Sequence, residues 1–168
     1  IMKHLFLLTL LCVTGIFLTF AQTSNWVFTG PSNFPTNISG QINGIGRVCQ
    51  LKFDPNNPNT IYACSASGGL WKSTNAGTSW ISMGTDKLPK MKIASVCIDH
   101  TNSNIIYLGS GDPNYYTDNL GIWKTTDGGL NWAQVNTGIG TFMALELLMD
   151  STDHLTLLAA TSNGIWKT

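Results

Sequence analysis

Two tyrosines and two carboxylates lie close together in the segment 111–119. The carboxylates could accept hydrogen bonds from sugar hydroxyl groups, and the tyrosine rings could stack on the apolar face of a sugar. The same oxygen atoms could instead hold Ca²⁺, which prefers oxygen ligands, although the sequence otherwise calls for no cofactor. The other interpretation, which we favour from the sequence, is a surface loop whose tyrosines pack on the neighbouring blade. The residues of this candidate binding site are Asp112, Tyr115, Tyr116 and Asp118.

Other arrangements that could do chemistry are sparse. His100 and His154 each follow an acidic residue in a polar stretch, and no Ser-His-Asp or Cys-His arrangement can be argued from them. The cysteines Cys49, Cys64 and Cys97 show no Cys-x-x-Cys spacing, which argues against a zinc site and against a disulfide framework. Cys49 and Cys64 are expected on neighbouring strands, so one bridge could form, but buried free thiols are the favoured interpretation.

Charge excludes several classes of partner. The formal net charge is zero, and charged residues make up only 11% of the chain. Nucleic-acid-binding domains carry a basic patch, and surfaces that bind anionic lipids carry clusters of Lys and Arg. The sequence therefore predicts neither a nucleic-acid partner nor a polybasic membrane surface.

The strongest local structural signal is a hairpin phrase at residues 121–132, Gly-Ile-Trp-Lys-Thr-Thr-Asp-Gly-Gly-Leu-Asn-Trp. Its Asp-Gly pair between apolar and aromatic residues predicts a tight turn, because these residues tolerate positive φ. The Asp127 carboxylate can accept hydrogen bonds from backbone N–H groups that a short loop leaves unpaired. The phrase also occurs at 69–80, with Asn75 in place of Asp, and begins again at 164–168.

The similarity extends ahead of each phrase to a strand, a polar turn that opens with Asp, and a second strand. Trp71 and Trp123 are 52 residues apart, whereas Trp123 and Trp166 are 43 apart; a seven-residue insertion before Trp123 accounts for most of the difference. A period in the mid-forties with four short antiparallel strands is typical of a β-propeller blade. We therefore predict an all-β propeller of four-stranded antiparallel blades. The expected blades span residues 47–83, 93–135 and 142–168.

Residues 22–45 form a polar lead-in before this repeat region, which spans 46–168. Trp26 and Phe28 have strand spacing, and we expect Trp26 to Phe28 to be the N-terminal strand that often completes the last blade of a propeller. Three blades cannot close a ring, so we expect this sequence to be the N-terminal fragment of a longer propeller. The alternative is a short protein that closes by oligomerising.

Residues 1–21 are expected to be a signal peptide. A short polar start is followed by the apolar stretch 5–20, which is short for a membrane span. Small residues before Gln22 fit a cleavage site there. The alternative is an uncleaved N-terminal anchor.

Both complete hairpins match the Asp-box, or BNR repeat: Ser or Thr, any residue, Asp or Asn, any residue, Gly, two residues, then Trp. The region from Gly40 to Thr168 resembles BNR-like and sortilin (VPS10-type) propellers, particularly those of large bacterial secreted proteins. The resemblance implies a fold and not a function, because Asp-boxes occur in sialidases, xyloglucan hydrolases, sorting receptors and assembly factors. The matching residues are Ser73, Asn75, Gly77, Trp80, Thr125, Asp127, Gly129 and Trp132.

Two enzyme families can be tested against this resemblance. Sialidases bind the substrate carboxylate with three arginines, whereas this sequence has only Arg47 and lacks the expected Arg-Ile-Pro phrase. Xyloglucan hydrolases place a catalytic Asp just ahead of the Gly-Gly of the first hairpin phrase, and that position is Ala66 here. Glycoside hydrolysis needs two carboxyl groups, so a hydrolase would need a different acid such as Asp112.

These observations predict a secreted or cell-surface β-propeller that binds or scaffolds an extracellular protein or glycan without catalysis. The alternative is a BNR-like carbohydrate-active hydrolase, related to xyloglucanases or sialidases. Further Asp-boxes followed by a sorting domain of the type IX secretion kind would favour the first prediction. A matched pair of carboxylates in facing loops would favour the second.

Overall fold

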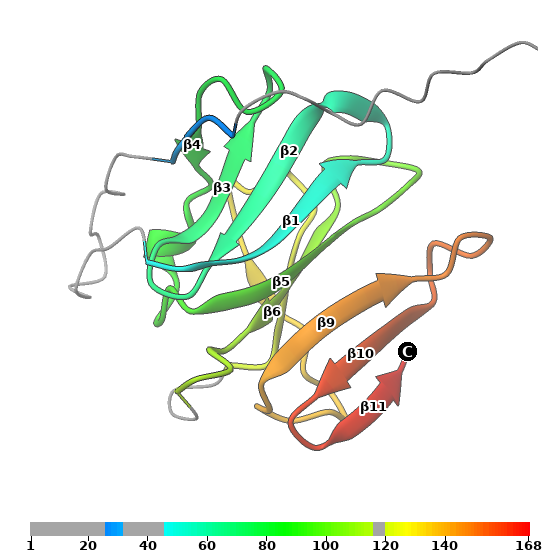
Figure 1. Ribbon diagram of the computed structural model, residues 1–168. Helices are drawn as coiled ribbons and strands as arrows, with labels where there is room; N and C mark the ends of the chain where they lie inside the picture. The colour runs from blue at the N-terminus through cyan, green and yellow to red at the C-terminus, as the bar shows by residue number, and fades with distance from the viewer. Residues whose placement is uncertain (1–25, 32–45, 116–119) are drawn as a thin grey trace, which may run out of the picture.

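The computed structural model describes residues 26–31, 46–115 and 120–168. These residues form antiparallel sheets that follow one another along the chain (Figure 1). The first sheet comprises β1 (Val48–Asp54), β2 (Asn57–Ser65), β3 (Gly69–Ser73) and β4 (Ile81–Ser82). The second comprises β5 (Ile93–Ile98), β6 (Ile106–Ser110), β7 (Ile122–Thr125) and β8 (Ala133–Gln134). The third comprises β9 (Ala144–Met149), β10 (Leu157–Thr161) and β11 (Gly164–Lys167).

Within each sheet, every strand pairs with the next strand along the chain, and we call the three sheets blades 1, 2 and 3. The first strands of the blades, β1, β5 and β9, are in contact with one another, so the blades fan out from this inner edge (Figure 1). A short 3-10 helix, η1 (Thr85–Lys87), lies in the connection from blade 1 to blade 2. This arrangement confirms the predicted all-β propeller with four-stranded antiparallel blades. The predicted signal peptide, residues 1–21, lies outside the described residues.

Burial along the inner strands shows where the core lies. Every residue of β5 is buried, because blade 2 is covered by blade 1 on one face and by blade 3 on the other. In β9, only Ala144 and Leu147 are buried, and Leu145 and Leu148 are exposed, because blade 3 is covered by blade 2 alone among the described residues. The core between blades 1 and 2 includes Leu70, Ile93 and Leu108, and Trp132 packs against it.

The hairpin turns are longer than predicted. Seven residues, 126–132, separate β7 from β8, where the sequence suggested a tight turn on the Asp-Gly pair. The positive φ angles fall at Gly128 (70°) and Gly129 (95°), the two residues after Asp127. The turn between β3 and β4 is equivalent, and there Ala76 adopts the first positive φ, of 54°. The turn is wide because its side chains bond the backbone inside it, as described below.

Residues 26–31 contain no strand, so the strand expected at Trp26 to Phe28 is not formed among the described residues. Among the described residues, no strand forms ladder hydrogen bonds with this segment, and the side chain of Trp26 is fully exposed. The segment is nevertheless attached to blade 1, because the Trp80 Nε1 donates to the Thr29 carbonyl oxygen at 3.0 Å. Its role in closing a ring stays a prediction.

The three cysteines of the described residues are free thiols. Cys49 and Cys64 lie on the neighbouring strands β1 and β2, as predicted. Cys64 and Cys97 are buried, and burial raises the pKa of both thiols. Cys49 is only half-buried. The expectation of buried free thiols is therefore confirmed for two of the three.

Candidate functional site

Strand direction divides the turns between two faces of the propeller. The turns from β2 to β3, from β6 to β7 and from β10 to β11 lie at one end of the sheets, which we call the loop face. The turns inside the hairpin phrases, residues 74–80 and 126–132, lie at the opposite end, which we call the hairpin face. The described part of the inserted segment, residues 111–115, therefore belongs to the loop face. Surface loops on a rigid scaffold are where binding residues concentrate.

Asp112 ties the inserted loop to blade 1. Its Oδ1 lies 2.5 Å from the Nη2 of Arg47, the residue that precedes β1. The same oxygen also accepts the Asn114 backbone N–H at 2.9 Å. The hydrogen bond and charge of Asp112 raise the pKa of Arg47. The Arg47 side chain is 48% exposed and that of Asp112 15%. This carboxylate is therefore already an ion-pair partner and lies largely beneath the surface.

Tyr115 presents its ring at the surface of the same loop. Its side chain is 62% exposed, and the Lys92 ammonium lies 4.7 Å from the ring centroid. The Tyr115 backbone N–H donates to the Asp112 carbonyl oxygen at 2.9 Å, which holds the two predicted site residues in one turn. Tyr116 and Asp118, the other two predicted site residues, lie outside the described residues.

Ala66 offers no acid group to the loop face. It follows β2 directly, is only 3% exposed, and its backbone N–H donates to the Arg47 carbonyl oxygen at 3.1 Å. Arg47 in turn holds Asp112. The position that the resemblance assigns to a catalytic Asp therefore carries a buried methyl group beside an ion pair.

Sequence reasoning missed a polar cluster on the inner strands, formed by Gln50, Lys52 and Glu146. Glu146 of β9 accepts a hydrogen bond from the Gln50 Nε2 at 2.5 Å and lies 3.0 Å from the Lys52 ammonium. The Gln50 side-chain Oε1 accepts the Val96 backbone N–H at 2.7 Å, so the cluster links all three blades. The sequence signal was polar residues at alternate positions in otherwise apolar strands.

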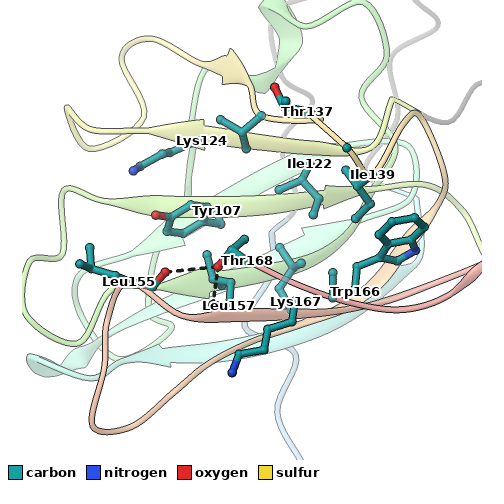
Figure 2. A pocket seen from close by; sticks show the side chains of 14 residues that line it. Tyr107, Ile122, Lys124, Thr137, Ile139, Leu155, Leu157, Trp166, Lys167 and Thr168 are labelled. Atoms are coloured by element: carbon teal, nitrogen blue, oxygen red, sulfur yellow. Dashed lines mark hydrogen bonds between the residues drawn. The ribbon is translucent and has the colours of Figure 1, made fainter.

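An apolar cleft of about 620 Å³ lies between blades 2 and 3. Figure 2 shows its lining, which includes Tyr107 and Ile122 from blade 2 and Trp166 from blade 3. Its lining residues include no carboxylate, so they do not supply the pair of carboxyl groups that glycoside hydrolysis needs. Between blades 1 and 2, Trp132 packs against the core and its indole N–H donates to the Met83 carbonyl oxygen at 3.2 Å. We therefore interpret the cleft as space between blades.

The hairpin turns confirm the predicted capping by Asp127. Its Oδ1 accepts the Asn131 backbone N–H at 2.9 Å and the Thr125 hydroxyl at 2.7 Å. Its Oδ2 accepts the Asn131 side-chain amide at 2.8 Å. These hydrogen bonds lower the pKa of Asp127 to about 2, and the bond from the Asn131 backbone N–H contributes most.

The turn of blade 1 repeats this arrangement with an amide in place of the carboxylate. The Asn75 Oδ1 accepts the Ser79 backbone N–H at 2.9 Å and the Ser73 hydroxyl at 2.9 Å. The Ser73 hydroxyl accepts the Gly77 backbone N–H at 2.9 Å, as the Thr125 hydroxyl accepts that of Gly129 at 3.0 Å in blade 2. These side chains hold the turns and leave little capacity to bind a ligand.

The histidines join blades on the hairpin face. The His154 Nδ1 lies 3.0 Å from the Asp99 Oδ2, and the His100 Nε2 lies 3.1 Å from the Asp150 carbonyl oxygen. Burial acts to raise the pKa of Asp99, but hydrogen bonds from Thr101 and His154 outweigh it and lower the pKa. Among the described residues, no group of three or more His, Cys, Asp or Glu side chains could hold a metal ion.

No model of a known protein family matches the chain. A xyloglucanase of Hypocrea jecorina is 27% identical over 110 residues, which cover 55% of this chain and 12% of that enzyme. The structure of a GH74 enzyme from Niastella koreensis matches with a TM-score of 0.57 and 26% identity, over 70% of this chain and 19% of the other. An ancestral GH74 enzyme matches with a TM-score of 0.58 and 22% identity, over 73% and 17%.

These similarities show a β-propeller of the kind found in GH74 enzymes. The chain matches only about an eighth of the length of the curated xyloglucanase. None of these three proteins is a sortilin, so the likeness to sortilin (VPS10-type) propellers stays a prediction.

Proposed function

We propose that this chain is part of a secreted propeller that binds a glycan of the xyloglucan type on its loop face and does not hydrolyse it there. The similarity to xyloglucanases supports the class of ligand. The observation that carries the non-catalytic part is the buried Ala66 at the position where the resemblance expects an acid. A propeller with this substitution keeps the scaffold of a glycan-binding face and loses one of the two carboxyl groups that hydrolysis needs.

The loop face provides the groups that such binding uses. The exposed ring of Tyr115 can stack on a sugar, and Arg47, which pairs with Asp112 of the same loop, can donate hydrogen bonds to hydroxyl groups. Tyr116 and Asp118 belong to the same proposal on the strength of the sequence. A long polysaccharide would extend from this loop across further blades. An extracellular protein ligand at the same face is the other form of the proposal.

A second candidate function is glycoside hydrolysis, because the relatives that match are hydrolases. On the loop face and inner strands, the described carboxylates of Asp112 and Glu146 are each paired with a cation, Arg47 or Lys52. Two further carboxylates, Asp54 at the end of β1 and Asp86 in η1, are buried. A hydrolase would have to use one of these or an acid from outside the described residues. In that case Asp112 is the residue to test first.

The test uses the full-length protein with soluble xyloglucan in two assays, isothermal calorimetry for binding and release of reducing ends for hydrolysis. We expect binding without release, and a loss of affinity of about tenfold in the Tyr115→Ala/Tyr116→Ala variant. Ring stacking contacts are worth about 0.5–1.5 kcal/mol each, and about 1.4 kcal/mol corresponds to a tenfold change in affinity. Leu130→Ala is the matched control, since Leu130 is 69% exposed on the hairpin face. Reducing ends released by the native protein but not by Asp112→Asn would establish the hydrolase instead.

Secretion is part of the same proposal. No helix in residues 26–31, 46–115 and 120–168 is long and apolar enough to span a membrane. We propose that residues 1–21 are removed during export, by the type IX route or another. Sequencing the N-terminus of the protein recovered from culture medium tests this, with Gln22 as the expected first residue.

A further inference from the structure

We propose that the contact between blades 2 and 3 responds to acid: protonation of His154 strengthens it, whereas the equivalent contact between blades 1 and 2 does not respond. Both contacts are made by the turns that follow the inner strands β1, β5 and β9, which lie at one end of the blades (Figure 1). The proposal concerns how tightly the blades are held together and does not rest on the proposed function.

The two contacts use the same position in the repeat. The turns align on Asp54, Asp99 and Asp150, the aspartates at the ends of the inner strands. The Ser103 hydroxyl, four residues after Asp99, donates to the Asp54 Oδ1 at 2.8 Å. His154, four residues after Asp150, has its Nδ1 3.0 Å from the Asp99 Oδ2. Each turn therefore bonds the aspartate of the preceding blade, once through a hydroxyl and once through an imidazole.

Of these two donors, only the imidazole changes its charge. A serine hydroxyl stays neutral, whereas a histidine side chain ordinarily becomes charged near about pH 6.5. Because a carboxylate only accepts hydrogen bonds, the bond to Asp99 requires a hydrogen on the Nδ1 of the neutral His154 ring. A proton added at Nε2 leaves this bond in place and makes it charge-assisted, which strengthens it. The same change of pH leaves the Ser103 bond as it was.

The partner carboxylate is held in its charged form. The side chain of Asp99 is only 2% exposed. Burial acts to raise its pKa, but hydrogen bonds from Thr101 and from His154 outweigh burial and lower the pKa. Such a carboxylate stabilises the folded protein above the ordinary carboxyl range, and this contribution is lost as the pH falls through the folded pKa. Both partners are therefore charged between about pH 4 and about pH 6.5, and the contact is strongest there.

The other charged groups around His154 in its own blade are mostly acidic. Asp153 belongs to the same turn: hydrogen bonds from Thr156 lower the pKa of Asp153 most, and the charge of His154 lowers it as well. Asp150 opens the turn, and the charge of Lys167 in β11 acts on it. A positive charge on His154 therefore has carboxylates near it in its own turn as well as across the contact.

His100 is a second imidazole at this contact. Its ring centroid lies 6.3 Å from that of His154, so a charge on His100 acts against a charge on His154. Its Nε2 lies 3.1 Å from the Asp150 carbonyl oxygen, which only accepts, so the neutral ring also makes this bond. In blade 1, the Asn56 side-chain amide donates to the Asp99 carbonyl oxygen at 3.2 Å and does not titrate. The acid response therefore depends on His154.

Hydrogen–deuterium exchange of the native full-length protein at about pH 5.5 and about pH 7.5 tests the proposal, with each rate divided by that of an unstructured chain at the same pH. We expect residues 150–157 to be about threefold better protected at the lower pH, a modest factor because the His154 side chain is 40% exposed. Residues 54–57, whose contact uses Ser103, are the internal reference and should keep the same protection. Equal protection of 150–157 at both pH values, or an equal gain in both segments, would overturn the proposal.

Two variants assign the response to one ring. His154→Asn keeps a side-chain N–H for Asp99 but does not titrate, so residues 150–157 should lose the difference between the two pH values. His100→Gln keeps an N–H for the Asp150 carbonyl oxygen and should retain the difference. A difference that survives His154→Asn, or that disappears with His100→Gln, would contradict the assignment to His154. The first experiment uses the native protein, so the proposal is tested even if a variant does not fold.

Discussion

The Asp127 carboxylate accepts three hydrogen bonds within the turn of blade 2, and its pKa falls from 3.8 to about 2. A carboxyl group whose pKa is lower in the folded protein stabilises it above the unfolded pKa, and this contribution is lost as the pH falls through the folded pKa. We therefore predict that residues 126–132 lose hydrogen-exchange protection between about pH 4 and pH 2.

The turn of blade 1 is a built-in control for this prediction. Asn75 makes the equivalent bonds to the Ser79 N–H and the Ser73 hydroxyl without a group that titrates there. Residues 74–80 should keep their protection over the same pH range. Replacing Asp127 with Asn should make the two turns behave alike, and parallel loss in both turns of the native protein would contradict the assignment to Asp127.

The buried hydroxyl of Thr125 stabilises the same turn through hydrogen bonds. It is 1% exposed, donates to Asp127 and accepts the Gly129 backbone N–H. Thr125→Val keeps the shape and leaves that N–H without a partner, so we expect a loss of about 1–3 kcal/mol in the free energy of unfolding. Chemical denaturation of the full-length protein measures this. Thr125→Ser, which keeps the hydroxyl, should recover most of the loss.

At the scale of the elements, blades 2 and 3 approach each other closely at Gly109 of β6. A Cβ at this position would lie 2.3 Å from the Ala144 carbonyl oxygen and 2.3 Å from the Ser95 Oγ. The carbonyl oxygen belongs to the backbone of β9 and cannot move independently of the strand. We predict that Gly109→Ala forces the two strands apart and costs about 1–3 kcal/mol or more, measured as a shift in the denaturation midpoint. An unchanged midpoint would mean that the blades are held less closely than the contacts indicate.

The elements that could be predicted from the sequence are those marked by local spacing. The repeat of Gly-x-Trp-Lys and the turn glycines fixed the order of the strands, and the extra residues in 111–119 marked the long loop of blade 2 correctly. The turn length was wrong because the Thr125 and Asp127 side chains bond backbone groups across seven residues, which a two-residue turn pattern does not describe.

Contacts between blades could not be predicted in the same way. The bonds of Gln50 to Glu146 and of His154 to Asp99 join residues 96 and 55 positions apart. They depend on how the sheets fan out, which no local pattern encodes. Alignment of the polar turns does reveal a rule in retrospect: Ser103 and His154 each lie four residues after the first Asp of their turn, and each bonds the equivalent Asp of the preceding blade.

At the scale of the whole molecule, the described blades form an arc with apolar surface on its inner edge. Leu51, Phe53 and Leu148 on the inner strands are between 52% and 65% exposed, although large apolar side chains in a propeller are normally covered by other blades. The edge strand β11 adds Ile165, which is 80% exposed, next to backbone groups without a strand partner among the described residues.

We therefore predict that residues 22–168, purified alone, self-associate or melt without cooperativity. Exposed apolar surface and a free strand edge both favour pairing with another molecule, and a lost interface between blades removes the cooperative unit. Light scattering gives the mass and calorimetry the sharpness of the transition. The full-length protein is the control and should be a monomer with a cooperative transition. A monomeric 22–168 segment with a sharp transition would contradict the prediction, because the arc would then be stable without further blades to cover its inner edge.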